Sequence, residues 1–117
     1  MPPKGAGRDT YRLTIILRNN TIPSMIVSFR DGATEQVWNG VFARRLPNQI
    51  QAVARRKLRM LNNARCLGDL RVPPNNRLEA LAGDRDGQWS IRINDQWRIF
   101  FVWNEGNAEG VEICDYH

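Results

Sequence analysis

Two arginines in the C-terminal third of the chain, Arg92 and Arg98, are the first candidates for chemistry. They lie in two apolar segments joined by a polar loop, and the hairpin register that the apolar pattern favours places them opposite each other. Like charges placed in this way repel, and such a pair is favoured where an anion such as a phosphodiester lies between them. The alternative is that both side chains turn to water or pair with Glu112 or Asp115.

The length of the loop decides this register. A two-residue turn at residues 94–95 would place Ile91 opposite Arg98 and mix the two faces of the hairpin. A three-residue loop at residues 94–96 keeps apolar residues opposite apolar ones, so the apolar pattern selects it. The longer loop pairs Ile93 with Trp97, Ile91 with Ile99, Trp89 with Phe101 and Arg92 with Arg98.

The last three residues, Asp115, Tyr116 and His117, bring together groups that can move protons. Histidine titrates near neutral pH, and tyrosine can stack on a nucleobase or transfer a proton. Glu79 precedes the hairpin by few residues and could reach the same face. Each feature also has a simpler reading, because a single terminal histidine and a single strand glutamate are usually surface residues.

Positive charge is concentrated in the middle of the chain, which has 117 residues and a formal net charge of +5. No acidic residue lies between Gln36 and Gly68. The basic residues of this stretch are Arg44, Arg45, Arg55, Arg56, Lys57, Arg59 and Arg65. This distribution indicates a surface for a polyanion such as RNA, although a solvated helix face would have the same pattern.

Cysteine content and hydropathy bear on location. Cys66 and Cys114 do not form a disulfide framework, and no histidine and cysteine cluster predicts a metal site. We therefore interpret both as reduced thiols. No apolar run approaches the ~20 residues that span a bilayer, and residues 13–17 are too short for a signal peptide. These features predict a soluble, cytoplasmic protein that does not enter a membrane.

The first 24 residues differ from the rest of the chain. They begin like a linker, and a strand at residues 11–17 would be broken by the following Asn- and Pro-containing segment. The pattern favours an N-terminal extension outside the fold at residues 1–24, with Met25 as the natural start. An ordered extra edge strand is the alternative.

Helical spacing predicts two helices after a first strand at residues 25–29. Asp31 or Thr34 can cap the first helix, whose apolar face consists of Val37, Trp38, Val41 and Phe42. Pro47 suits the first turn of the second helix, whose apolar face consists of Ile50, Val53, Ala54, Leu58 and Leu61. The residues expected to lie off this face, in solvent, are Arg55, Arg56 and Arg59.

Four further strands should follow the helices, separated by turns rich in glycine or asparagine. Their expected ranges are about residues 78–81, 88–93, 97–103 and 111–115. Two N-terminal helices packed on a small antiparallel sheet make an α+β fold.

Three segments together resemble the HigB toxins of bacterial toxin–antitoxin modules, particularly the GraT-like branch, within the wider RelE-like ribonuclease group. They are PPNNRLEALAGDR at residues 73–85, QWSIRINDQWR at residues 88–98 and EICDYH at residues 112–117, with further likeness at residues 25–29 and 53–61. The resemblance implies a RelE-like, HigB-like toxin domain at residues 25–117. Residues 1–24 have no counterpart in it.

The resemblance implies an mRNA endonuclease that acts in the ribosomal A site and inhibits translation. The RNA's own 2′-hydroxyl attacks the adjacent phosphate in this family, which needs neither a metal nor a cofactor. Carried over residue by residue, Arg98 would stabilise the charge of the transition state and Arg92 would support it. The terminal residues that match the family's catalytic residues are Asp115, Tyr116 and His117.

The general base and the RNA-binding surface are carried over in the same way. Glu79 occupies the place where some RelE-like relatives have a carboxylate base and other HigB proteins have a histidine. Ala82 stands where some relatives have a lysine, so one positive charge is missing here. The expected RNA- or ribosome-binding residues are Arg77, Arg85, Arg55, Arg56, Lys57 and Arg59.

The resemblance also implies a partner, a HigA-like antitoxin with a helix-turn-helix fold. The complex would repress its own operon, with operator DNA bound only through the antitoxin. A competing hypothesis is a non-catalytic RNA- or ribosome-binding subunit, or an operon co-repressor. The two arginines and the three terminal residues favour the enzyme.

Overall fold

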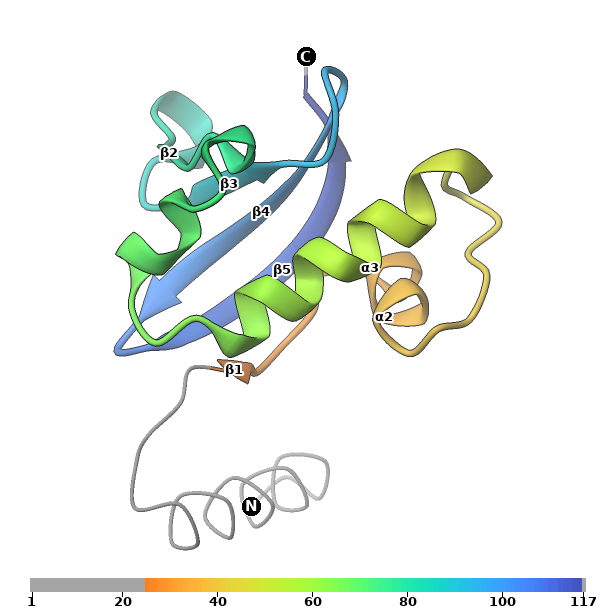
Figure 1. Cartoon of the computed structure of the whole chain (residues 1–117), viewed down its shortest axis with the longest axis horizontal. Helices are drawn as coiled ribbons and strands as arrows, with labels where there is room; N and C mark the ends of the chain where they lie inside the picture. Colours follow the sequence, from red (N-terminus) through yellow and green to blue (C-terminus); the bar gives the residue numbers. More distant parts are fainter. Residues whose placement is uncertain (1–24, 117) are drawn as a thin grey trace, which may run out of the picture.

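Residues 25–116, which the computed structural model describes, form two helices and a five-stranded sheet (Figure 1). In chain order the elements are β1 (Met25–Ile26), α2 (Gly32–Trp38), α3 (Asn48–Asn63), the 3-10 turns η1 (Leu67–Arg71) and η2 (Pro74–Asn76), β2 (Glu79–Ala80), η3 (Gly83–Arg85), β3 (Trp89–Arg92), β4 (Trp97–Asn104) and β5 (Asn107–Asp115). None of the helices in this part of the chain has the length and apolar character needed to cross a membrane. The extension at residues 1–24, with its possible strand, and His117 lie outside the described residues.

The strands lie in the spatial order β1-β5-β4-β3-β2. Strands β2 to β5 form an antiparallel meander, as the sequence predicts. Strand β1 instead pairs in parallel with β5, with Met25 opposite Asn107 and Ile26 opposite Ala108. The expectation of a wholly antiparallel sheet is wrong at this edge. In chain order both helices lie between β1 and the meander, and this crossover allows β5 to run in the same direction as β1. The α+β class is confirmed.

Helix α2 is capped by Asp31 and bonded to the sheet by Thr34. The Asp31 carboxylate accepts a 2.9 Å hydrogen bond from the Thr34 backbone N–H, which satisfies one donor of the first turn. The Thr34 hydroxyl accepts a 2.9 Å hydrogen bond from the Ile113 N–H of β5. Because Thr34 is fully buried, this bond fixes α2 on strand β5.

Helix α2 ends earlier than its apolar pattern predicts. Gly40 has a φ of +79°, a left-handed conformation that ends a helix and favours glycine. Val41 and Phe42 therefore lie on the irregular segment after α2 and do not continue its buried face. They are 53% and 56% exposed.

Helix α3 packs its apolar face on the same side of the sheet. Pro47 stands immediately before the helix, where its fixed φ is compatible with a helix start. Arg56 and Arg59 are exposed as expected. Arg55 is only partly exposed, and its Nε donates a 3.4 Å hydrogen bond to the Trp38 carbonyl. The buried apolar residues of α3 are Ile50, Ala54, Leu58 and Leu61.

The β3–β4 hairpin has the register that the apolar pattern predicts. Its opposed residues are Trp89 and Phe101, Ser90 and Phe100, Ile91 and Ile99, and Arg92 and Arg98. Ile91, Ile99 and Phe101 are fully buried in the core between the sheet and the helices. Because side chains alternate along a strand, the two arginines project from the other face.

Candidate functional site

Arg98 is the centre of the candidate site. It lies on β4, projects from the sheet face opposite the helices, and is only 7% exposed. Its Nη1 is 3.7 Å from Glu79 Oε1 on β2. Its guanidinium carbon lies 4.3 Å from the centroid of the Tyr116 ring, just after β5. Three elements far apart in the sequence thus bring Glu79, Arg98 and Tyr116 together, as the sequence predicts.

The buried donors of Arg98 have unused capacity. Among residues 25–116, Nε and Nη1 find no hydrogen-bond partner, and neither does the hydroxyl of Ser90. Ser90 is fully buried and lies opposite Glu79, so it shares a face with Arg98. Buried polar groups are normally hydrogen-bonded. An anionic oxygen at this place would receive charge-assisted hydrogen bonds from a guanidinium that the fold already holds.

Arg92 lies opposite Arg98, but its side chain turns to the loop of the hairpin. Its Nη2 donates a short hydrogen bond to the Asp95 carboxylate, and this bond holds the pKa of Asp95 below its ordinary value. The repulsion between the two arginines is thus relieved within the hairpin itself. Asp115, considered from the sequence as a partner of Arg92, accepts a 2.9 Å hydrogen bond from the Gln96 side-chain amide.

A cleft of about 510 Å³ is lined by Arg85 and by Tyr116, the ring that the Arg98 guanidinium contacts. The guanidinium carbon of Arg85 is 4.2 Å from the centroid of the Phe100 ring, and its Nη1 is 3.4 Å from a Glu112 carboxylate oxygen. The Tyr116 ring packs edge-on against Phe100 and is 39% exposed. Such a lining of aromatic ring and guanidinium suits a nucleobase next to the phosphate. The other lining residues are Leu81, Ala82, Asp84 and Asp115.

The arginines of α3 lie away from this site. Helix α3 contacts β1 and β5 on one face of the sheet (Figure 1). Arg98 projects from the other face, because it alternates along β4 with the buried Ile99. The exposed Arg56 and Arg59 of this helix therefore lie across the sheet from Arg98. Arg77 is exposed between η2 and β2, and it lies near enough to Asp95 to help lower the pKa of that carboxyl.

The assignment of Lys57 to RNA binding is wrong. Lys57 is only 5% exposed, and its Nζ donates a hydrogen bond to the side-chain oxygen of Asn76. Burial, together with the nearby Arg56 and Arg92, lowers the pKa of Lys57 from its ordinary value. Position 57 lies on the buried stripe of α3, seven residues after Ile50. Its ammonium joins α3 to η2 and is not available to RNA.

The sheet face that carries Glu79, Ser90, Arg98 and Phe100 is called the active face below. Sequence reasoning missed two of these residues, Ser90 and Phe100. Ser90 is 0% and Phe100 is 4% exposed, and Arg85 and Tyr116 pack over Phe100. The signal was present in the sequence, since both residues alternate with core positions and fall in phase with Arg92 and Arg98.

The chemistry open to this site is acid–base chemistry on a bound anion. Within residues 25–116, no group of three or more His, Cys, Asp or Glu side chains could hold a metal ion. Burial raises the pKa of the Cys114 thiol to about 12, so it stays protonated near neutral pH and is a poor nucleophile. Glu79 and Tyr116 are the titratable groups that touch Arg98.

Comparisons with known proteins point in the same direction. The family model for HigB-like toxins, described as RelE-like toxins of type II toxin–antitoxin systems, matches residues 27–117. Toxin HigB-1 of Vibrio cholerae is 41% identical over 85 residues, which are 72% of this chain and 90% of that protein. Endoribonuclease HigB of Proteus vulgaris is 44% identical over 41 residues, which are 35% of this chain and 45% of that protein.

A solved structure of a YoeB/ParE toxin from Agrobacterium tumefaciens is similar with a TM-score of 0.46 and 19% identity, over 80% of this chain and 98% of that one. The span of the family model nearly coincides with the residues that the sequence resemblance covers. The GraT-like branch remains a prediction from the sequence.

Proposed function

We infer the function from the family. The chain belongs to the HigB-like family of RelE-like toxins of type II toxin–antitoxin systems, and on this basis we propose that it is an endoribonuclease. Its substrate would be mRNA in the ribosomal A site, and cleavage there would inhibit translation. The observation that carries this proposal is Arg98, a buried guanidinium with unused donors between Glu79 and Tyr116. A phosphodiester has the anionic oxygens that such donors bind. The relative named Endoribonuclease HigB supports the same activity.

The residues of the active face divide the reaction among them. Glu79, whose side chain is 46% exposed, takes the proton of the 2′-hydroxyl as its oxygen bonds to the adjacent phosphorus. The bond from phosphorus to the next 5′-oxygen breaks, and that oxygen receives a proton from Tyr116 or His117. Arg98 stabilises the charge that builds on the non-bridging oxygens, and Arg92, whose side chain is held by Asp95, would support it only by adding positive charge from the opposite strand. The products carry a 2′,3′-cyclic phosphate and a 5′-hydroxyl.

The ribosome would supply the orientation that the active face lacks. One buried arginine and a few titratable groups can neutralise a phosphate, but they do not hold a flexible RNA in line for attack. Orientation can contribute on the order of 7–11 kcal/mol to such a barrier. The exposed Arg56, Arg59 and Arg77 would dock on ribosomal RNA, so activity should weaken as salt rises.

The partner would be an antitoxin of the HigA type, with operator DNA bound through it. Residues 39–47 separate α2 from α3, and this connection is longer than the short turn of a helix-turn-helix, so the two helices of residues 25–116 do not form that DNA-binding motif. A helix-turn-helix antitoxin would bring that element. We place the toxin in the cytoplasm, where ribosomes and the operon are.

Cleavage is expected only when translating ribosomes are present. Purified protein would be incubated with mRNA alone and with the same mRNA under translation, and the fragment ends would be mapped. We expect fragments with a 2′,3′-cyclic or 3′-phosphate in the ribosome reaction and intact RNA without ribosomes. Efficient cleavage of naked RNA would contradict the ribosome requirement. Loss of that naked-RNA cleavage in EDTA would point to a metal nuclease instead.

Ser90→Ala is expected to lower activity while raising stability slightly. The Ser90 hydroxyl is buried without a hydrogen-bond partner in residues 25–116, so its removal relieves a desolvation cost. The same hydroxyl lies opposite Glu79 on the active face, and a shift of the side chains that cover it when RNA binds would let it bond the phosphate. We expect single-turnover cleavage on ribosomes to slow by about tenfold, as for the loss of one such bond, with an unchanged or higher Tm. A lower Tm with full activity would show a structural role only.

A further inference from the structure

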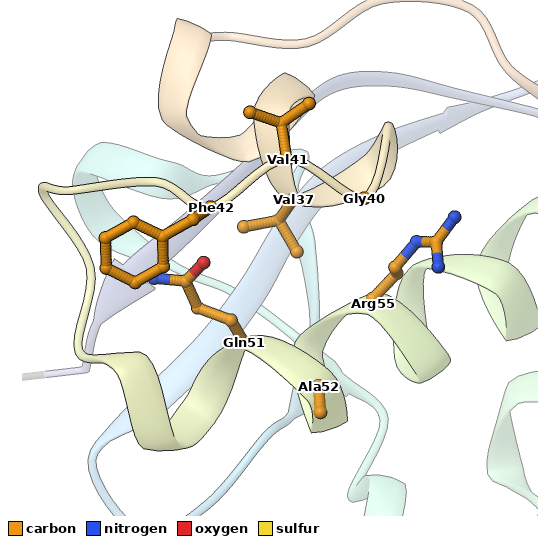
Figure 2. A pocket seen from close by; sticks show the side chains of 7 residues that line it. All are labelled: Val37, Gly40, Val41, Phe42, Gln51, Ala52 and Arg55. Carbon is orange, nitrogen blue, oxygen red and sulfur yellow. The ribbon is translucent and has the colours of Figure 1, made fainter.

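A hollow of about 240 Å³ lies between the end of α2 and the first half of α3 (Figure 2). Val37 forms its buried floor, and Phe42 and Val41 rise beside it from the irregular segment after α2 (Figure 2). Arg55 closes one end. The reaction proposed above uses none of these side chains.

The hollow is held in shape by hydrogen bonds of Gln51 on α3. The Gln51 side chain accepts a 3.0 Å bond from the Ala43 N–H and donates bonds of 2.7 and 3.0 Å to the carbonyls of Ala43 and Leu46. Arg55 is fixed by its bond to the Trp38 carbonyl. Its guanidinium packs so closely on Gly40 that a Cβ there would lie 3.2 Å from its Cζ. Hydrogen bonds within the chain therefore shape the sides of the hollow without a partner.

Two properties of this hollow restrict what it can bind. Val41 and Phe42 are adjacent large apolar residues, each more than half exposed, and such a patch marks a surface that a partner covers. Among the residues that line the hollow Arg55 is the charged one, and the stretch from residue 37 to residue 67 around it contains seven basic residues and no acidic one. A ligand that fits must combine apolar side chains with negative charge.

Charge argues against the occupants that this chain itself could provide. Residues 1–24 contain four basic residues and one acidic residue, so the extension repels a basic hollow. A second copy of the chain carries a net charge of +5 and meets the same repulsion. RNA satisfies the charge and a base could stack on Phe42, but a planar base gives little cover to the aliphatic Val41 and Val37 beside it. A peptide that bears both carboxylates and apolar side chains satisfies both requirements.

We propose that this hollow is a docking site for the antitoxin, and that it takes a short acidic segment with a large apolar side chain. The apolar side chain would enter between Val41 and Phe42, and a carboxylate would pair with Arg55 at the closed end. The partner follows from the toxin–antitoxin family and not from the nuclease assignment, so the two proposals can fail separately.

The test uses the toxin with the antitoxin encoded beside it, and it measures their affinity by titration calorimetry. Phe42→Ser should weaken binding by at least about tenfold, because it removes the exposed apolar wall. Val102→Ser is the matched control, since Val102 is an exposed apolar residue on β4. It should change the affinity by less than about twofold. Equal affinity of Phe42→Ser and the native protein would overturn the proposal.

Two substitutions of opposite charge at position 52 test whether the docked antitoxin segment is acidic. Ala52 lines the hollow on the exposed side of α3, and glutamate and lysine have similar helix propensity there. Ala52→Glu should weaken the complex by about fivefold or more, and Ala52→Lys should leave it equal or tighter. An opposite order would overturn the proposal. So would variants that lose ribosome-dependent cleavage with unchanged antitoxin affinity, because they would assign the hollow to ribosomal RNA.

Discussion

Arg98→Ala is expected to slow cleavage of ribosome-bound mRNA by about 100-fold or more, which is the usual cost of removing one preorganised donor from a transition state. Arg98 is buried, and its position is determined by β4, Glu79 and Tyr116. Nothing else among the described residues places a guanidinium between these two groups. Single-turnover rates on programmed ribosomes, together with growth arrest in cells, would measure the effect.

The same substitution should leave the fold intact. The buried Nε and Nη1 of Arg98 make no hydrogen bond within residues 25–116, and Glu79 is exposed enough for water to solvate it. Arg98→Lys keeps the charge but loses the planar fork, so it should restore only part of the rate. Arg71→Ala, at an exposed position on η1, should cleave like the native protein. A well-folded Arg98→Ala protein with full toxicity would refute the assignment.

The β3–β4 hairpin shows what local pattern can predict. The register followed from keeping Ile91 opposite Ile99, since a shift of one residue would have exposed the whole apolar set. That register also placed Arg92 and Arg98 opposite each other. The partner of Arg92 was not foreseen, although Asp95 is only three residues away. Strand alternation predicts the face of the sheet from which a side chain projects. It does not predict the direction in which a long side chain then turns.

Contacts between distant segments account for the other differences. The parallel pairing of β1 with β5 depends on how the chain crosses the sheet, which strand periodicity does not encode. Val41 and Phe42 have helical spacing in the sequence, but α2 ends before them because Gly40 adopts a left-handed conformation. Lys57 lies on the buried stripe of α3 by spacing, but lysine is almost never buried without a partner. That partner, Asn76, is 19 residues away.

Asn76→Ala is expected to destabilise the protein by about 3 kcal/mol or more, because it leaves several buried polar groups without partners. Asn76 is fully buried. Its amide donates to the carbonyls of Leu70 at 3.1 Å and Val72 at 3.3 Å, and its oxygen accepts from Lys57. These bonds join α3, η1 and the segment that leads to Glu79 on β2. A Tm lower by more than about 10 °C should result, and activity should fall with it.

The pH dependence of this loss separates the role of Lys57 from that of the two carbonyls. Burial lowers the pKa of Lys57, so the folded state binds its proton less tightly than the unfolded state, and stability rises as the pH increases from the folded pKa towards the ordinary value. Without Asn76 the ammonium loses an acceptor, which lowers that pKa further. Urea unfolding should therefore show a smaller loss for Asn76→Ala at about pH 10 than at about pH 7. Asn75→Ala, at an exposed neighbouring position, should cost little at either pH. An equal loss for Asn76→Ala at both values would show that Lys57 does not depend on Asn76, and that the carbonyls of Leu70 and Val72 carry the whole effect.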